Sequence, residues 1–361
     1  MMSCSQCTCH APPGDPAAID HGERIRRIDA HAHISPSSSA EAIEFYRRFG
    51  VEVVVNVSGR YPGRGLEEAI EASRASHGHL YFMCNIPWLL PVDDPRFVPM
   101  AISALNQCYE QGGLAWKIHK ILGLGAVYSD GSLVPVDAPE LDPIFEHAGE
   151  LGIPVLIHAG DPVAFFNAPT QDNERYEELT VHPGWSFYGD DFPSWEEIYA
   201  QFERRVARHP QVRFIGAHFG NAPEYPERVA AMLDRYPNFF IDTAARVPEI
   251  GRQDPQVMHD FFVRYQDRIL FATDIGYGRD PLGRLHLALG SSGAEEPTEQ
   301  DIERFWESTY RYFETRDVSF PNPTPIQGRW PISGIGLPRE VLEKLYHGNA
   351  ERLLGISLPS E

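Results

Sequence analysis

The chain has 361 residues, of which 42% are hydrophobic and 23% are charged, as is typical of globular proteins. Its 51 Asp and Glu residues outnumber its 31 Lys and Arg residues, which gives a formal net charge of −20. A field of this sign repels phosphate backbones and anionic lipids, and no apolar run reaches the roughly 18 residues needed to span a bilayer. We therefore expect neither nucleic acid nor a membrane as a partner.

Residues 1–24 are predicted to form a flexible tail, because the segment is rich in proline and has no apolar periodicity. Three of the five cysteines lie there beside a histidine, in the order Cys4, Cys7, Cys9 and His10. This C-x-x-C-x-C-H pattern could be a small clip for a soft metal ion, or its cysteines could be incidental. No second cysteine pair follows at a suitable distance, which favours the incidental interpretation.

The tail also lacks the charged and then apolar pattern of an export signal. We therefore expect a cytoplasmic protein with reduced thiols. The two remaining cysteines, Cys84 and Cys108, lie in apolar surroundings and are predicted to pack as small hydrophobic side chains.

From residue 25 on, apolar strand-like runs alternate with amphipathic helical stretches. The predicted strands are 26–34, 51–57, 80–85, 114–119, 153–158, 212–218, 239–242 and 268–273. The predicted helices between them are 40–49, 66–76, 97–110, 142–151, 195–208, 224–236 and 257–265. Eight such units in about 250 residues match a (β/α)8 TIM barrel of the α/β class. A doubly wound sheet is the alternative, but no G-x-G-x-x-G follows the first strand.

Two further segments complete a single domain, 25–361. Residues 159–193 are rich in Pro, Gly and aromatic side chains, and loops of this length are typical of active-site lids. Residues 276–361 are predicted to be a C-terminal helical extension packed on the barrel, with helices at 302–313 and 339–354. The aromatic stripe of the first of these helices packs on the barrel or on a second subunit, so a homo-oligomer is possible.

Residues of metal-ligand type end several of the predicted strands. His31 and His33 are two apart on the first strand, so their side chains project from one face and can bind one ion together. The carboxyl ends of barrel strands ring a single mouth, where such groups would be desolvated together and costly unless paired or metallated. The other strand ends carry Lys117 and His119 on strand four, His158 on strand five, His218 on strand six and Asp274 on strand eight.

This order of ligand-type residues resembles that of the amidohydrolase superfamily of metal-dependent barrels. The C-terminal run at 346–354, YHGNAERLL, is similar to the terminal motif of its amidohydrolase-related branch. That branch also contains nonoxidative decarboxylases such as aminocarboxymuconate-semialdehyde decarboxylase. The resemblance extends from about residue 28 to residue 354 and is specific for fold and metal rather than for substrate.

The resemblance implies that His31, His33, His158 and Asp274 bind one divalent ion. Zn²⁺ is favoured by the ligand types, with Mn²⁺ and Fe²⁺ as alternatives. His218 would lie beside the metal-bound water or the substrate and stabilise developing charge. Asp274 would accept the proton of that water and pass it to the leaving group.

Lys117 has two interpretations. In two-metal members of the superfamily the matching lysine is carbamylated and bridges both ions, whereas a charged ammonium would bind a substrate carboxylate. The branch more often carries one ion, which favours the second form. His119 is predicted to line the pocket, and Arg175 and Arg246 are candidate substrate contacts, although solvated charges are the alternative. Asp242 is expected to cap a turn.

The leading hypothesis is a metal-dependent hydrolase that activates a metal-bound water to cleave an amide, ester or lactone bond of a small molecule. The alternative is a metal-dependent nonoxidative decarboxylase of an aromatic or unsaturated carboxylic acid. A third hypothesis is a metal-binding protein without catalytic activity. Substrate specificity in such a barrel lies in its loops.

Overall fold

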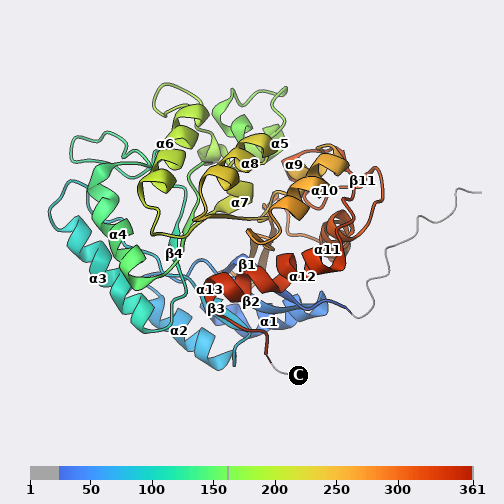
Figure 1. Cartoon of the computed structure of the whole chain (residues 1–361), viewed down its shortest axis with the longest axis horizontal. Coiled ribbons are helices and arrows are strands. Elements are labelled where there is room, and N and C mark those ends of the chain that lie inside the picture. The colour runs from blue at the N-terminus through green and yellow to red at the C-terminus, as the bar shows by residue number, and fades with distance from the viewer. Residues whose placement is uncertain (1–23, 161, 281, 360–361) are drawn as a thin grey trace, which may run out of the picture.

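The computed structural model describes residues 24–160, 162–280 and 282–359. At its centre are two five-stranded sheets with the strand orders β10-β9-β1-β2-β3 and β4-β5-β6-β7-β8, and helices lie around them (Figure 1). The barrel strands are β1 (Arg27–Ile34), β2 (Val51–Asn56), β3 (Leu80–Phe82), β4 (Trp116–Ile118), β5 (Val155–Ile157), β6 (Phe214–Gly216), β7 (Phe239–Asp242) and β8 (Ile269–Leu270).

Backbone hydrogen bonds join the two sheets at both seams. Between β3 and β4, the Cys84 N–H donates to the Ala115 carbonyl (2.7 Å), and the Lys117 N–H donates to the Cys84 carbonyl (2.8 Å). Between β1 and β8, the Ala30 N–H donates to the Phe271 carbonyl (3.0 Å). The predicted TIM barrel is confirmed, although its paired strands are shorter than the apolar runs suggested.

Helices separate successive strands as the alternating pattern predicted. Several of the predicted boundaries differ from the observed ones by one to three residues, because apolar side chains continue beyond the last backbone hydrogen bond. The helices are α1 (Ser39–Arg48), α2 (Leu66–Ala75), α3 (Phe97–Glu110), α4 (Asp142–Leu151), α5 (Tyr176–Val181), α6 (Trp195–Arg208), α7 (Ala217–Gly220), α8 (Pro226–Arg235), α9 (Val247–Gly251), α10 (Pro255–Arg264), α11 (Glu299–Glu314), α12 (Arg339–Glu343) and α13 (Asn349–Leu354).

Strand β1 changes the face that it presents to the barrel interior. Ile28 and Ala30 pack in a cluster that draws residues from many barrel strands, so they point inward. A regular strand would place Ala32 on that same face, yet Ala32 packs in the outer cluster. The pairing of β1 with β2 shifts register between Asp29 and Ala32. This irregularity turns the strand immediately before the two histidines, as bulges beside active sites do.

The C-terminal extension packs on the barrel, as predicted. The Trp306 ring of α11 stacks on Phe49 with ring centroids 5.1 Å apart, and the Tyr310 hydroxyl donates to the Phe49 carbonyl (2.8 Å). The predicted helix 339–354 consists of α12, a π-helical turn at Lys344–Gly348 and α13. Four short strands were not predicted, namely β9 (Ile275–Arg279), β10 (Leu285–Leu289), β11 (Phe320–Pro321) and β12 (Pro331–Ile332).

The prediction of reduced thiols at Cys84 and Cys108 is wrong, because the structure joins them in a disulfide. The end of β3 and the last turn of α3 bring their Cα atoms to 5.7 Å, within disulfide range. Gly113 lies against both sulfur atoms and leaves no room for a side chain. The cysteines of residues 1–24, with their predicted flexible tail or metal clip, lie in a segment of which only Arg24 is described.

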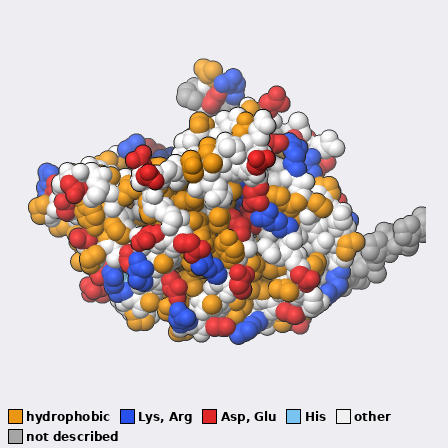
Figure 2. All heavy atoms as spheres, turned by 90° about the horizontal axis from the view of Figure 1, so that it is seen from above, with side chains coloured by type: hydrophobic (Ala, Val, Ile, Leu, Met, Phe, Trp, Pro, Cys, Tyr) orange, Lys and Arg blue, Asp and Glu red, His pale blue; other side chains and the backbone are white. Residues whose placement is uncertain are grey.

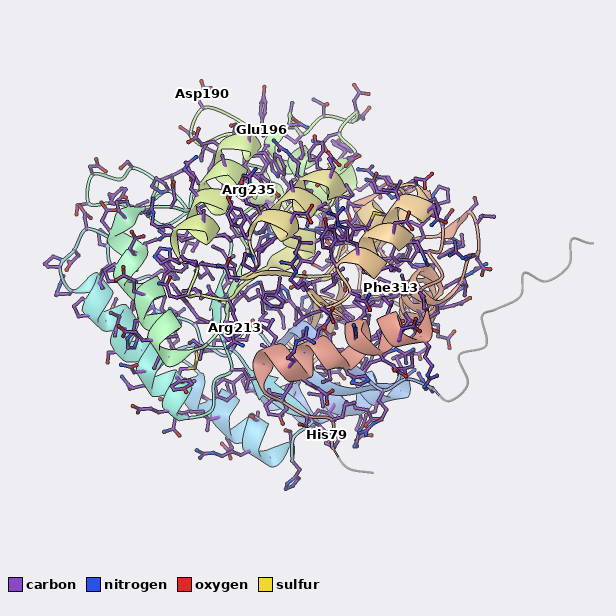
Figure 3. All side chains as sticks on the ribbon, in the orientation of Figure 1. His79, Asp190, Glu196, Arg213, Arg235 and Phe313 are labelled. Atoms are coloured by element: carbon purple, nitrogen blue, oxygen red, sulfur yellow. A yellow bond between two sulfur atoms is a disulfide. The ribbon has the colours of Figure 1, made fainter. Side chains whose placement is uncertain are left out.

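Charged side chains of both signs are interspersed over the face seen in Figure 2. Figure 3 shows Asp190 at the outer edge of the molecule, whereas Phe313 of α11 is buried. Within the described ranges, we find no helix long and apolar enough to cross a membrane.

Candidate metal and active site

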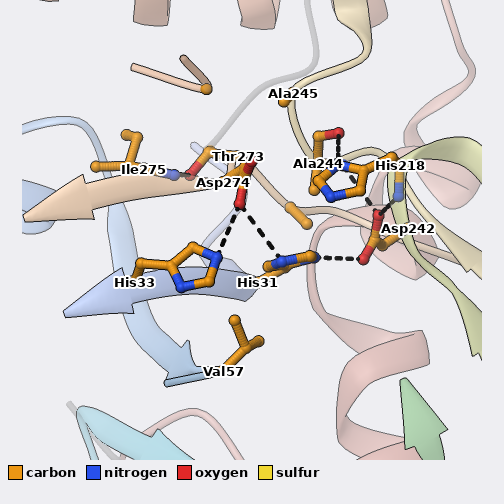
Figure 4. A network of polar contacts seen from close by, with 12 residues as sticks. His31, His33, Val57, His218, Asp242, Ala244, Ala245, Thr273, Asp274 and Ile275 are labelled. Carbon is orange, nitrogen blue, oxygen red and sulfur yellow. Dashed lines mark hydrogen bonds and ion pairs between the residues drawn. The ribbon is translucent and has the colours of Figure 1, made fainter. Parts of the chain in front are cut away.

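Three side chains converge where β1 and β8 end (Figure 4). An oxygen of Asp274, Oδ1, lies 3.4 Å from Nε2 of His31 and 3.2 Å from Nε2 of His33. One ligand atom from each residue lies within 4.8 Å of the other two. Ligands about 2.1 Å from one tetrahedral ion are separated by about 3.4 Å. The donor set and its spacing therefore fit a divalent cation.

The second nitrogen of each imidazole is already held. Nδ1 of His31 lies 2.8 Å from Oδ2 of Asp242, and Nδ1 of His33 lies 2.6 Å from the Ser58 hydroxyl. Such contacts fix the tautomer and the orientation of a metal-ligating histidine. Nε2 of each ring faces Oδ1 of Asp274, so both nitrogens would be available to an ion that replaces these contacts.

Asp242 was expected to cap a turn, and its Oδ1 does accept the N–H of Ala244 (3.2 Å). It also accepts the N–H of His218 (2.8 Å) while holding His31, so it supports the site as well. No local sequence pattern indicates this second role, because the contact joins β7 to β1, 211 residues apart.

Left-handed backbone conformations cluster at the same strand ends. His218 follows β6 with φ 55°, Ala245 follows β7 with φ 54°, and Asp274 follows β8 with φ 61°. Residues with a side chain adopt this region only where the surroundings enforce it, and such strain gathers at functional sites. At His218, Nδ1 donates to the Ala244 carbonyl (3.0 Å). Burial holds the pKa of this imidazole well below its ordinary value, so the ring is neutral and Nε2 carries no proton.

His158 was predicted to be the fourth metal ligand. Its ring lies 4.2 Å from that of His218, and both residues line the cavity next to Asp274. It is not a member of the three-residue group, so its coordination stays a prediction.

Lys117 is buried beside the ligand group, with Nζ 3.3 Å from Nε2 of His31. Burial lowers the pKa of Lys117, which increases the fraction of neutral amine. His119 is two residues away, and its ring lies 6.0 Å from that of His33. Burial and the neighbouring Lys117 lower the pKa of His119 to about 2, so this imidazole is neutral.

The protonation states of the group suit metal binding. Burial and Lys117 hold the pKa of His31 well below its ordinary value, so its imidazole is neutral. Burial opposes ionisation of Asp274, but the hydrogen bond from His33 and the nearby His218 hold its pKa well below the usual range. A carboxylate among imidazoles is a typical donor set for Zn²⁺ and similar ions.

A cavity of about 340 Å³ opens above these residues. Phe165 and Trp185, from the segment predicted to be a lid, line it together with Arg246. The predicted lid is therefore ordered into short helical turns that cover the site. Lys120, with Nζ 4.5 Å from the Trp185 ring centroid, was not predicted. The other unpredicted lining residues are Glu178, Gly276, Ala288, Gly290, Ser291, Ser292 and Gln327.

Arg246 and Arg175 differ sharply in their positions. Arg246 borders the cavity, and its one hydrogen bond that the structure gives runs from Nη1 to the Ala245 carbonyl (3.0 Å). Arg175 is fully buried between Glu178 (2.8 Å) and Glu249 and does not line the cavity. Its predicted role as a substrate contact is therefore corrected to an internal ion pair.

Residues 28–356 match a family model described as Amidohydrolase. The chain belongs to the amidohydrolase family. Members of this family are enzymes and generally use a divalent metal ion. No curated protein matches the chain.

Solved structures share the amidohydrolase barrel at low sequence identity. An uncharacterized TIM-barrel protein of Bordetella bronchiseptica is 15% identical, with TM-score 0.50, over 92% of this chain and 99% of its own. A probable 2-pyrone-4,6-dicarboxylic acid hydrolase of Acinetobacter baumannii is 10% identical, with TM-score 0.50, over 92% and 100%. IDCase of Metarhizium anisopliae is 14% identical, with TM-score 0.50, over 88% and 79%. These likenesses concern the fold.

Proposed function

We propose that this amidohydrolase is a metal-dependent hydrolase that cleaves an amide, ester or lactone bond of a small molecule carrying a carboxylate. The observation that carries the proposal is the convergence of His31, His33 and Asp274 at ligand spacing beneath a cavity. Arg246 at the edge of that cavity supplies a cation for the substrate carboxylate.

A divalent ion held by His31, His33 and Asp274 would supply a Lewis acid that polarises a substrate carbonyl and acidifies water. We expect Zn²⁺ and one ion per chain, with His158 completing the set. Asp274 is ionised, so its carboxylate can accept a proton from the attacking water and return it to the leaving group. The neutral His218, whose Nε2 lacks a proton, can accept a hydrogen bond and orient that water.

Lys117 decides between one ion and two. As an ammonium it would attract a substrate carboxylate, and as a carbamate it would bridge a second ion. Metal analysis together with intact-protein mass after growth with labelled bicarbonate separates these forms. We expect one ion and no carbamate. Two ions with an added carboxyl mass would instead assign the bridge to Lys117.

A decarboxylase of an aromatic or unsaturated acid is the second candidate. The aromatic cover formed by Phe165 and Trp185 favours it, because these rings offer a stacking surface for an aromatic or unsaturated acid. Decarboxylation also needs a proton donor for the carbanion that is left behind. Asp274 is ionised and His218 is neutral, so neither offers that proton readily, and hydrolysis remains the better proposal.

The experiment is a substrate panel with metal-loaded protein, comparing wild type with Asp274→Ala. The panel contains lactones, esters and amides of carboxylic acids, 2-pyrone-4,6-dicarboxylate among them, together with hydroxybenzoates monitored for CO₂. We expect hydrolysis by wild type and its loss in the variant. Full hydrolytic activity in Asp274→Ala would refute the mechanism, and CO₂ release without hydrolysis would assign the lyase reaction.

A further inference from the structure

A second cavity, of about 460 Å³, lies on the β2–β4 side of the ligand group. Its floor includes Ser58, which holds His33, and Lys117, which contacts His31. His119 lines this cavity and also the first one. The two cavities therefore lie next to the same ligand group and share His119 as a lining residue.

Two arginines stand at the outer part of the second cavity. Arg60 and Arg64 are exposed and line it together with Tyr61. Many other exposed arginines of this acidic chain pair with carboxylates, as Arg96 does with Asp94 (2.7 Å), although Arg74 and Arg316 do not. Among the residues that the structure describes, no ion pair involves Arg60 or Arg64, and the Arg64 guanidinium donates only to the Tyr61 hydroxyl (3.3 Å). Their charge is available to a ligand.

The backbone of Arg60 has a strained conformation. Its φ is 70°, in the left-handed region. Asn85 holds it from both sides, because the Asn85 side chain accepts the Arg60 N–H (2.7 Å) and the Asn85 N–H donates to the Arg60 carbonyl (3.0 Å). A side chain at Gly59 would collide with the Met83 carbonyl (1.9 Å), so the segment is pressed onto the end of β3.

The same asparagine ties this segment to the ligand group. Its side-chain amide donates to the Lys117 carbonyl (3.3 Å), and Lys117 contacts His31. Strain that is fixed by buried hydrogen bonds is a mark of a preorganised functional segment. Trp88, at the other wall of the cavity, adds an aromatic surface for the apolar body of a ligand.

We propose that the second cavity binds an anionic group of the substrate, a carboxylate or a phosphate, on Arg60 and Arg64. The substrate then extends past His119, with its reacting bond at the ligand group and a second carboxylate at Arg246 in the first cavity. This inference rests on the proposed function and specifies its substrate class as elongated molecules with an anion at each end. Guanidinium groups suit both anions, since each offers oxygens for paired hydrogen bonds.

The test measures binding without turnover, so its failure is distinct from a failure of the hydrolase proposal. Metal-loaded protein is titrated calorimetrically with α,ω-dicarboxylates from succinate to suberate, with the monocarboxylate of each length, and with inorganic phosphate. We expect one dicarboxylate length to bind about ten- to a hundred-fold more tightly than its monocarboxylate. Phosphate competing with the dicarboxylate would point to a phosphorylated substrate, and the absence of competition would point to a second carboxylate.

Two variants locate the effect. Arg60→Gln and Arg64→Gln should each remove most of the dicarboxylate advantage while leaving monocarboxylate affinity within about two-fold. Arg74→Gln, on the same side of the molecule but outside the cavity, should keep the advantage. The proposal is overturned if no dicarboxylate exceeds its monocarboxylate, or if both cavity variants retain the wild-type advantage.

Discussion

Two buried clusters of charged side chains, one around Arg175 and one around Asp274, differ in the groups that surround their carboxylates. Around Arg175 each carboxylate has a cation from the chain, since Glu178 and Glu249 both pair with the guanidinium. Around Asp274 the contacts are imidazoles, those of His31 and His33. The first cluster contains its own counter-ion, whereas Asp274 shares with His31 and His33 the spacing of a cation site, beside the buried Lys117. Burial of charge alone therefore does not identify a site, and the decisive feature is what neutralises it.

The largest effect should follow from removing the negative charge of Asp274. Asp274→Asn keeps the shape but loses the anionic ligand, so bound metal should fall well below one ion per chain, and kcat/KM by about a thousand-fold or more. Elemental analysis and hydrolysis rates measure both. Asp94→Asn, at an exposed ion pair, serves as the control. Unchanged metal content in Asp274→Asn would remove the distinction between the two clusters.

Disrupting the ion pairs of Arg175 should lower the stability of the protein but not its metal content. Arg175→Met leaves Glu178 and Glu249 buried without their cation, which should cost about 3–5 kcal/mol of unfolding free energy in denaturant titrations. Metal per folded chain should stay at the wild-type value. Arg96→Met, on the surface, should change stability by less than about 0.5 kcal/mol. A variant that lost metal while staying stable would show that the two clusters act together.

Removing the ion should lower the thermal stability only of proteins that keep Asp274. Bound metal stabilises the folded state by about 2.7 kcal/mol when free metal is a hundred times its dissociation constant. Chelation should therefore lower the melting temperature of wild type and of Arg175→Met by similar amounts, but not that of Asp274→Asn. Scanning calorimetry with and without chelator measures these shifts. Equal shifts in all three proteins would mean that the ion binds elsewhere.

The smallest effect is expected at the carboxylate that orients His31. Asp242→Asn keeps the hydrogen-bonding shape but loses the charge, and metal affinity should weaken by about ten- to a hundred-fold. Competition with a chromophoric chelator measures this change. Ser58→Ala, which removes the uncharged partner of His33, should weaken affinity less. A larger loss of metal affinity in Ser58→Ala than in Asp242→Asn would contradict the role of Asp242 in orienting His31.

Local pattern in the sequence predicted much of the site. The alternation of strands and helices determined the barrel, and a barrel brings the carboxyl ends of its strands to one mouth. His31, His33 and Asp274 were therefore predicted to converge even though 241 residues separate His33 from Asp274. Arg246 was predicted to lie near the same mouth, because it closely follows the strand at 239–242. The positions of such residues follow from strands and helices that the local hydrophobic periodicity predicts.

What the sequence by itself determined was the set of chemical groups at each strand end, since strand period and chain order fix which side chains reach the mouth. The tertiary structure decided which charges are already neutralised. In the fold, Arg175 forms an internal ion pair, Asp242 contacts the His31 imidazole, and Cys84 forms a disulfide with Cys108. Those pairings depend on contacts between segments that no local pattern relates, because a partner for a buried charge is chosen by distance in space and not along the chain.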